Sequence, residues 1–163
     1  MSPSQIEERV VTDRIGVIDR MLAELRRLPT EDLTAFQEDP RTPAAAESFL
    51  RRALEALLDL GRHLLAKGFG QPVDEYAAIA DRLGEVGVLM PSEASLLREM
   101  ARYRNRMVHF YNEITVSELY GIITEELGDF ATIRSSITSW LAEHPEQVNR
   151  SAPADEPPES DPA

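Results

Sequence analysis

The segment from residue 92 to 114 constrains the fold most, because its large apolar side chains recur at helical spacing. They are separated by steps of four, three, four, three and four residues, at Leu96, Met100, Tyr103, Met107, Phe110 and Ile114. This repeat places them on one face of an α-helix. We therefore predict a helix at 92–113 that buries this face in a core.

Four other segments show the same kind of spacing, and no segment alternates as a strand would. Helix-start signals support the assignment: Ser4 with Glu7 and Thr115 with Glu118 match capping boxes, and Thr42-Pro43 is a suitable N-cap and first-turn pair. The predicted helices are 5–28, 43–67, 73–86, 92–113 and 116–142. The fold class is therefore all-α, an up-and-down helical bundle of four long helices plus a short one, without a sheet.

The chain has 163 residues, a length typical of one domain. From about Pro145 the composition changes, and the stretch 151–162 is rich in proline and acids with no large apolar side chain. Such a segment buries too little apolar surface to offset the entropy of ordering it. We therefore divide the chain into a helical domain at 1–144 and a disordered acidic tail at 145–163.

Composition excludes several kinds of site. Cysteine is absent, so there is no disulfide, thiol nucleophile or cysteine-based metal site. The three histidines lack metal-ligand spacing, and no glycine-rich phosphate loop occurs. We expect neither a metal nor a cofactor.

Charge and hydropathy restrict the location and the partners. No apolar run approaches the roughly 18 residues of a membrane span, and the acidic N-terminus is unlike a signal peptide. We expect a cytoplasmic protein with no membrane partner. The net charge of −12 argues against broad nonspecific nucleic-acid binding, which depends on many Lys and Arg contacts to phosphate.

The candidate catalytic and binding side chains all lie on the 92–113 helix, namely Arg104, Asn105, His109 and Tyr111. A neutral imidazole such as His109 can serve as a general base near physiological pH. A guanidinium such as Arg104 can clamp phosphate oxygens and stabilise the transition state. Asn105 could bind phosphate or orient His109, and Tyr111 could stack on a base. Arg102 is a candidate accessory phosphate ligand, within a strip of arginines at 98, 102, 104 and 106.

One geometrical difficulty remains, because Arg104 and His109 lie about 140° apart on an ideal helix. They converge only if the helix breaks, if Arg104 wraps around it, or if a second subunit contributes. Arg104 also lies on a second, semi-apolar face of this helix with Leu97, Ala101, Val108 and Tyr111. A second apolar face on a helix already committed to a core indicates an interface, so we predict a homodimer.

The motif Arg104-Asn105-x-x-x-His109-x-Tyr111 resembles the R-x4-H-x-Y signature of HepT-like HEPN toxins. The stretches 55–66 and 75–89 are similar to the preceding helices of that family. The resemblance implies an all-α homodimer whose two motifs share a cleft, and a ribonuclease toxin acting on cellular RNA, including tRNA. It further implies a nucleotidyltransferase antitoxin of the MntA kind that adds AMP groups to Tyr111.

Other interpretations stay open. A catalytically silent HEPN module would bind a nucleotide or its nucleotidyltransferase partner and cleave nothing, and a helical adaptor would carry the motif by coincidence. His109 alone would be an ordinary surface histidine, and Arg102 an ordinary solvated arginine. Asp59 and His63, spaced i and i+4, could form a structural pair.

Overall fold

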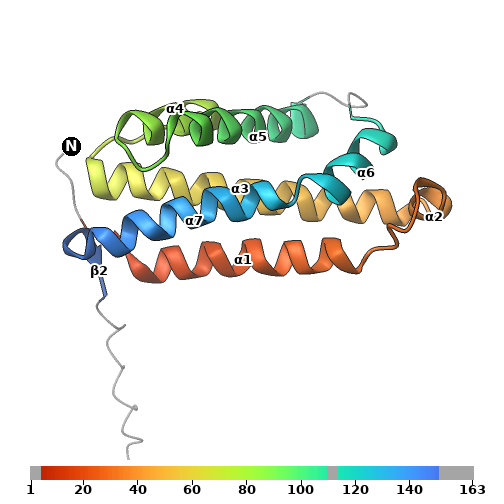
Figure 1. The fold of residues 1–163 in the computed structure, drawn as a ribbon, viewed down its shortest axis with the longest axis horizontal. Helices are drawn as coiled ribbons and strands as arrows, with labels where there is room; N and C mark the ends of the chain where they lie inside the picture. Colours follow the sequence, from red (N-terminus) through yellow and green to blue (C-terminus); the bar gives the residue numbers. More distant parts are fainter. Residues whose placement is uncertain (1–4, 110–113, 151–163) are drawn as a thin grey trace, which may run out of the picture.

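The computed structural model describes residues 5–109 and 114–150, which form an elongated bundle of helices (Figure 1). Its α-helices are α1 Glu8–Arg27, α2 Leu33–Glu38, α3 Arg41–Phe69, α4 Tyr76–Glu85, α5 Pro91–His109, α6 Val116–Glu125 and α7 Gly128–Glu143. A 3-10 turn, η1, at Pro145–Gln147 and two short strands, β1 Ile6–Glu7 and β2 Val148–Asn149, complete the described part. The predicted all-α bundle is confirmed.

The central helix of the bundle is α3, which packs against α1, α4, α5 and α6. Figure 1 shows it running along the molecule between α1 on one side and α4 with α5 on the other. Leu57, Leu60 and Leu64 are fully buried on it. A helix with neighbours on several sides must be apolar over most of its circumference, since each neighbour covers a different face. This helix is therefore the scaffold on which the other elements are positioned.

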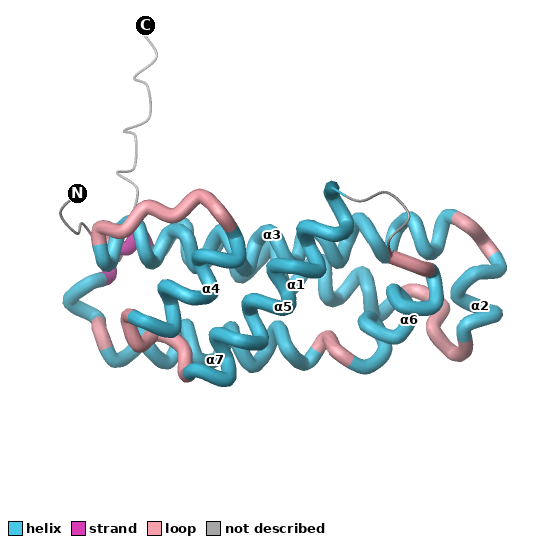
Figure 2. The backbone as a smooth tube through the Cα atoms, turned by 90° about the horizontal axis from the view of Figure 1, so that it is seen from above, coloured by secondary structure: helices cyan, strands magenta, loops and turns pink. Residues whose placement is uncertain are grey.

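The helices α4 and α5 lie side by side along α3, as the view from above shows (Figure 2). Close approach of α4 to α3 depends on Gly61. A Cβ atom on Gly61 would lie 2.9 Å from Ile79 Cγ2 and 2.9 Å from Leu83 Cδ1, both on α4. Because glycine lacks this atom, the helices can approach, and Tyr76 at the start of α4 comes to lie against α3.

The predicted helix at 116–142 is two helices, α6 and α7, which is a correction to the sequence analysis. Glu126 has φ −116° and ψ 3°, outside helical values, and Gly128 begins α7. The interruption lets α6 pack against α2 and α3 while α7 packs against α5. The predicted cap at its start is confirmed, because Thr115 Oγ1 accepts a hydrogen bond from the Glu118 N–H at 3.0 Å.

Three other predicted helix starts were wrong, and one of them is that of the helix predicted at 73–86, which begins at Tyr76. The first helix begins at Glu8 instead of residue 5, with no side-chain cap at Glu7, while Ser4 lies outside the described residues. The second begins at Arg41, before Thr42-Pro43, because the Asp39 carboxylate accepts the Arg41 backbone N–H at 3.0 Å. The loop before it contains α2, whose cap Asp32 accepts from the Ala35 N–H at 2.7 Å.

The two ends of the helical domain meet in a parallel pair of strands, which corrects the expectation of no sheet and of disorder from Pro145. Ile6 in β1 pairs with Val148 in β2, and Ile6 is fully buried. The Glu7 N–H donates to His63 Nε2 at 3.0 Å, so His63 does not pair with Asp59 as considered above. Burial lowers the pKa of His63, which favours the neutral imidazole that can accept this bond. Residues 145–149 thus belong to the folded domain, and the predicted tail at 151–163 lies outside the described residues.

No helix in residues 5–109 and 114–150 is both long enough and apolar enough to cross a membrane.

Candidate active site

The face of α5 that packs into the core is wider than the predicted one, because Leu97 and Ala101 join the predicted Leu96, Met100, Tyr103 and Met107 in packing against the core. Leu97 and Ala101 are fully buried and Met100 is 8% exposed, whereas Tyr103 and Met107 are only partly buried. Leu97 and Ala101 belong to the face that we assigned to a dimer interface. Within one chain α5 already packs against α3 and α4. The semi-apolar face therefore gives no support for a homodimer.

Arg104 lies at the edge of this buried face, where α3 holds its guanidinium. Its Nε and Nη2 donate to Glu55 Oε1 at 3.2 and 3.1 Å, and its side chain is 19% exposed. Its Nη1 lies 3.4 Å from Asn105 Oδ1. A guanidinium has five N–H donors. One N–H on each terminal nitrogen therefore has no partner among the described residues, and these two form the end-on fork that suits a phosphate.

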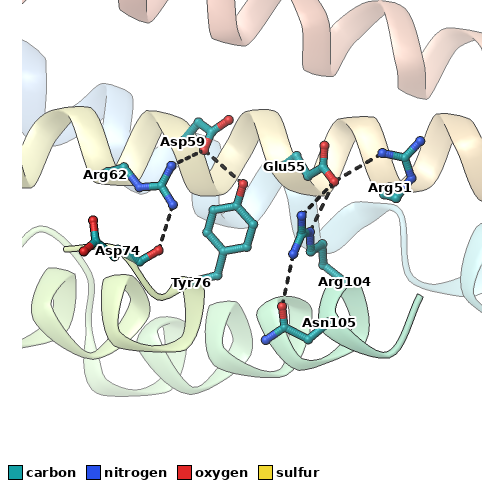
Figure 3. A network of polar contacts seen from close by, with 8 residues as sticks. All are labelled: Arg51, Glu55, Asp59, Arg62, Asp74, Tyr76, Arg104 and Asn105. Carbon is teal, nitrogen blue, oxygen red and sulfur yellow. Dashed lines mark hydrogen bonds and ion pairs between the residues drawn. The ribbon is translucent and has the colours of Figure 1, made fainter. Parts of the chain in front are cut away.

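Glu55 belongs to a row of polar side chains on α3, which Figure 3 shows facing Arg104 and Tyr76. The Tyr76 hydroxyl donates to Asp59 Oδ1 at 3.1 Å, and the Tyr76 ring lies between two guanidinium groups. The ring centroid is 4.7 Å from Arg104 Cζ and 5.0 Å from Arg62 Cζ. Such contacts add cation–π attraction to the hydrogen bonds. Burial and then the Asp59 carboxylate raise the pKa of Tyr76, so that its hydroxyl stays protonated as a donor.

Arg62 anchors the loop before α4 to the same row. Its Nη1 donates to Asp59 at 3.0 Å, its Nε to the Val73 carbonyl at 3.1 Å, and its Nη2 to the Asp74 carbonyl at 2.9 Å (Figure 3). These bonds fix the backbone just before Tyr76. Tyr76, which stacks on Arg104, is thus held at its hydroxyl by Asp59 and at its backbone by the loop that Arg62 fixes.

A pocket of about 520 Å³ opens beside this network and contains three of the predicted site residues together. Its lining is Arg62, Asp74, Glu75, Tyr76, Ala77, Arg104, Asn105 and His109. His109 is the exposed last residue of α5, and no described residue bonds to its imidazole. Arg104 and His109 thus line one pocket within a single chain, although they lie about 140° apart around the helix.

Arg102, the other predicted site residue that the structure describes, lies outside this pocket. Arg102 is exposed, pairs with Glu99 at 2.8 Å and does not line it. Tyr111 lies outside the described residues. The arginine strip is not a continuous positive surface either, because Arg98 pairs with Asp81 and Arg106 with Glu118, in addition to the pairs above.

The sequence analysis did not identify Glu55, Arg62 or Tyr76 as site residues. Glu55, Asp59 and Arg62 are spaced i, i+4 and i+7, which places them on one helix face and was a usable signal for a polar surface. Tyr76 carried no comparable signal, since its position depends on how α4 packs on α3. No group of three or more potential metal ligands occurs within 5–109 and 114–150.

Comparison with known proteins assigns the chain to a family. Residues 18–137 match the family described as Ribonuclease HepT-like. The chain belongs to the HepT-like ribonuclease family. This HepT-like chain is 24% identical over 139 residues to the tRNA nuclease HepT of Aphanizomenon flos-aquae (strain 2012/KM1/D3), covering 85% of the chain and 94% of that relative.

Solved structures share the fold of this HepT-like chain at lower identity. One is the tri-AMPylated HEPN toxin of Shewanella oneidensis in complex with its MNT antitoxin, with a TM-score of 0.72 and 19% identity, covering 80% of this chain and 97% of that one. Another is the cytosolic protein YutE of Bacillus subtilis, with a TM-score of 0.70 and 20% identity, covering 86% and 94%. The family resemblance drawn from the motif is thus confirmed.

Proposed function

We propose that this HepT-like chain is a metal-independent endoribonuclease toxin whose catalytic residues are Arg104 and His109. The proposal rests on one observation, which is that Arg104, Asn105 and His109 line the same pocket. The name of the curated relative, a tRNA nuclease, supports tRNA as the substrate class.

The arrangement suits transesterification at an RNA phosphate. The exposed His109 imidazole takes the proton of the 2′-hydroxyl, and the 2′-oxygen attacks phosphorus. The free fork of Arg104 binds the non-bridging oxygens, on which negative charge increases in the transition state. The bond to the 5′-oxygen breaks, and that oxygen takes up a proton, leaving a 2′,3′-cyclic phosphate. Asn105, the neighbour of Arg104 in the pocket, can donate its amide N–H to the same phosphate.

The direct test is to incubate the purified chain with tRNA in a chelator and to analyse the ends of the fragments. We expect cleavage with a cyclic phosphate on one fragment and a 5′-hydroxyl on the other. A reaction that needs a divalent metal would contradict the mechanism.

One observation favours the second candidate function, a silent module that binds its nucleotidyltransferase partner without cleaving RNA. Asp74 and Glu75 also line the pocket, and carboxylates repel phosphate. The same incubation separates the two functions, because a silent module would leave the tRNA intact.

We further propose control by a nucleotidyltransferase antitoxin that adds AMP to Tyr111. Support comes from the motif tyrosine two residues after His109 and from the Shewanella structure, whose HEPN toxin is tri-AMPylated and bound to an MNT antitoxin.

A homodimer also remains a proposal, now supported by the family resemblance and not by the semi-apolar face of α5. We expect light scattering at micromolar concentration to give twice the mass of the 163-residue chain. A symmetric dimer would use the same surface twice. A monomer that still cleaves tRNA would exclude the need for a second subunit.

Replacing Glu55 with glutamine should lower the cleavage rate by about 10- to 100-fold, because charge-assisted hydrogen bonds contribute roughly 1.5–3 kcal/mol. Glutamine keeps the shape but loses the charge that holds the Arg104 Nε and Nη2. Since Glu55 orients Arg104 and does not touch substrate, the loss should fall mainly on kcat, with little change in KM.

The matched control for this variant is Glu85→Gln, which removes a carboxylate from an exposed ion pair with Arg82. Its cleavage kinetics should be those of the unchanged chain. An aspartate at position 55 should restore part of the lost kcat, since it keeps the charge. Unchanged kinetics in Glu55→Gln would show that Glu55 does not position Arg104.

A further inference from the structure

A second hollow, here called the α5–α6 groove, shares no residue with the candidate active site. It has a volume of about 560 Å³ and is lined by residues of α3, α5, α6 and α7 and of the α6–α7 junction. Apolar side chains form much of its lining, namely Leu54, Leu96, Met100, Ile122 and Phe130. A groove of this kind between helices offers an apolar surface that a further helix can cover.

A tyrosine hydroxyl in this groove lacks a partner. Tyr103 lines the groove, and its hydroxyl oxygen is buried without any hydrogen bond. Burial, then the charge of Glu118, raises the pKa of Tyr103, so the hydroxyl is neutral. Because buried polar groups in proteins are nearly always hydrogen-bonded, this hydroxyl is an unsatisfied polar group in the wall of the groove and destabilises the free chain.

Three carboxylates on the groove also lack a cation. Glu125, Glu126 and Asp129 line it, and none of them forms an ion pair with a described residue. Burial raises the pKa of Glu126, and the neighbouring charges of Asp129 and Glu125 add to the effect. These like charges repel one another, and a bound cation would relieve the repulsion.

We propose that the α5–α6 groove binds a basic amphipathic helix of a partner protein. The apolar stripe of that helix would cover Leu96, Met100 and Ile122, and its Lys or Arg side chains would pair with the three free carboxylates.

Charge excludes the other obvious occupants. Nucleic acids and anionic lipids present phosphates, which the acidic rim repels. A second copy of this chain is the remaining alternative, which the Ile122→Glu variant below tests. A helix with a cationic border is therefore the partner that the groove fits. This inference does not depend on the nuclease function.

The test uses the full chain and a synthetic peptide of about 14 residues, roughly 21 Å long as a helix. Leucines at i, i+3, i+4 and i+7 form its stripe, and lysines fill the other positions. One comparison peptide carries glutamate in place of every lysine. A second has the same leucines and lysines in scrambled order. We expect fluorescence anisotropy to detect binding of the ordered lysine peptide, with at least about tenfold weaker binding of the other two.

Charge variants separate docking in the groove from general attraction to an acidic protein. Replacing Glu125, Glu126 and Asp129 by Gln, Gln and Asn should weaken binding by at least about tenfold. The matched control replaces three exposed acids outside the groove that form no ion pair with a described residue, Glu31, Glu38 and Glu143, by glutamine. It changes the net charge by the same amount, but because these acids do not line the groove it should weaken binding by less than about twofold. Equal losses in both triple variants, or equal binding of all three peptides, would overturn the proposal.

Two single substitutions keep the test independent of the charge variants. Tyr103→Phe removes the unpaired hydroxyl, so it should raise the melting temperature of the free chain while peptide binding changes by less than about twofold, because the buried hydroxyl does not contact the peptide. Ile122→Glu should abolish peptide binding while circular dichroism stays helical. If Ile122→Glu instead converts a dimer into a monomer, the occupant is a second copy and the proposal is wrong.

Discussion

Replacing His109 with alanine should reduce tRNA cleavage by at least about 100- to 10,000-fold, the range typical of a lost general base. His109 is exposed at the end of α5 and bonds to no described residue, so its removal should leave the melting temperature nearly unchanged. Arg104→Ala should abolish cleavage too. It should also destabilise the fold, because it leaves Glu55 without its partner across the α3–α5 contact. Cleavage by the unchanged chain should persist in chelator.

The matched histidine control is His144→Ala. His144 stacks on Trp140 with ring centroids 4.2 Å apart and does not line the active-site pocket. This variant should keep full cleavage while losing some stability. Arg104→Lys refines the test, because lysine keeps the charge but not the fork, and we expect it to remain strongly impaired. Cleavage by the His109 variant at the original rate would rule out the proposed base.

Replacing Tyr111 with phenylalanine should make the chain resistant to its antitoxin, so that co-expression no longer rescues growth. The sequence places Tyr111 seven residues after Arg104, about 20° away if the helix continues, although Tyr111 lies outside the described residues. An AMP group on Tyr111 would bring a phosphate to the free fork of Arg104 and repel incoming RNA. After co-expression with the transferase and ATP, peptide mass spectrometry should locate the adduct on Tyr111.

Two other tyrosines, Tyr103 and Tyr120, are internal controls for this modification. The Tyr103 hydroxyl is buried, and the Tyr120 hydroxyl donates to the Thr30 carbonyl at 3.0 Å, so neither is free to accept AMP. Phenylalanine at either position should leave neutralisation intact. An adduct on another residue, or catalytic neutralisation of Tyr111→Phe, would contradict the proposed control.

The apolar spacing alone determined the fold class and most of the helices, because helix formation depends on local periodicity. In the segment predicted as a helix at 116–142, apolar residues at helical spacing such as Leu119, Ile123, Ile137 and Trp140 are buried. The family also followed from a local pattern, the short motif around Arg104 and His109 with the helices that precede it.

Which face of α5 is buried was decided only by the tertiary structure. Periodicity identifies apolar faces but does not say which neighbour will cover each of them. Leu97 and Ala101, which we assigned to a dimer, are covered by α3 and α4 of the same chain. Leu96 and Tyr103, which we assigned to the core, line the α5–α6 groove.

The candidate site likewise depends partly on residues that are neighbours in the sequence and partly on contacts between residues far apart in it. The sequence identified Arg104, Asn105 and His109 because they lie within six residues of one another. Glu55 is 49 residues from Arg104, and Tyr76 reaches it only because Gly61 lets α4 approach α3. Contacts across such separations arise from helix packing, which local periodicity does not encode.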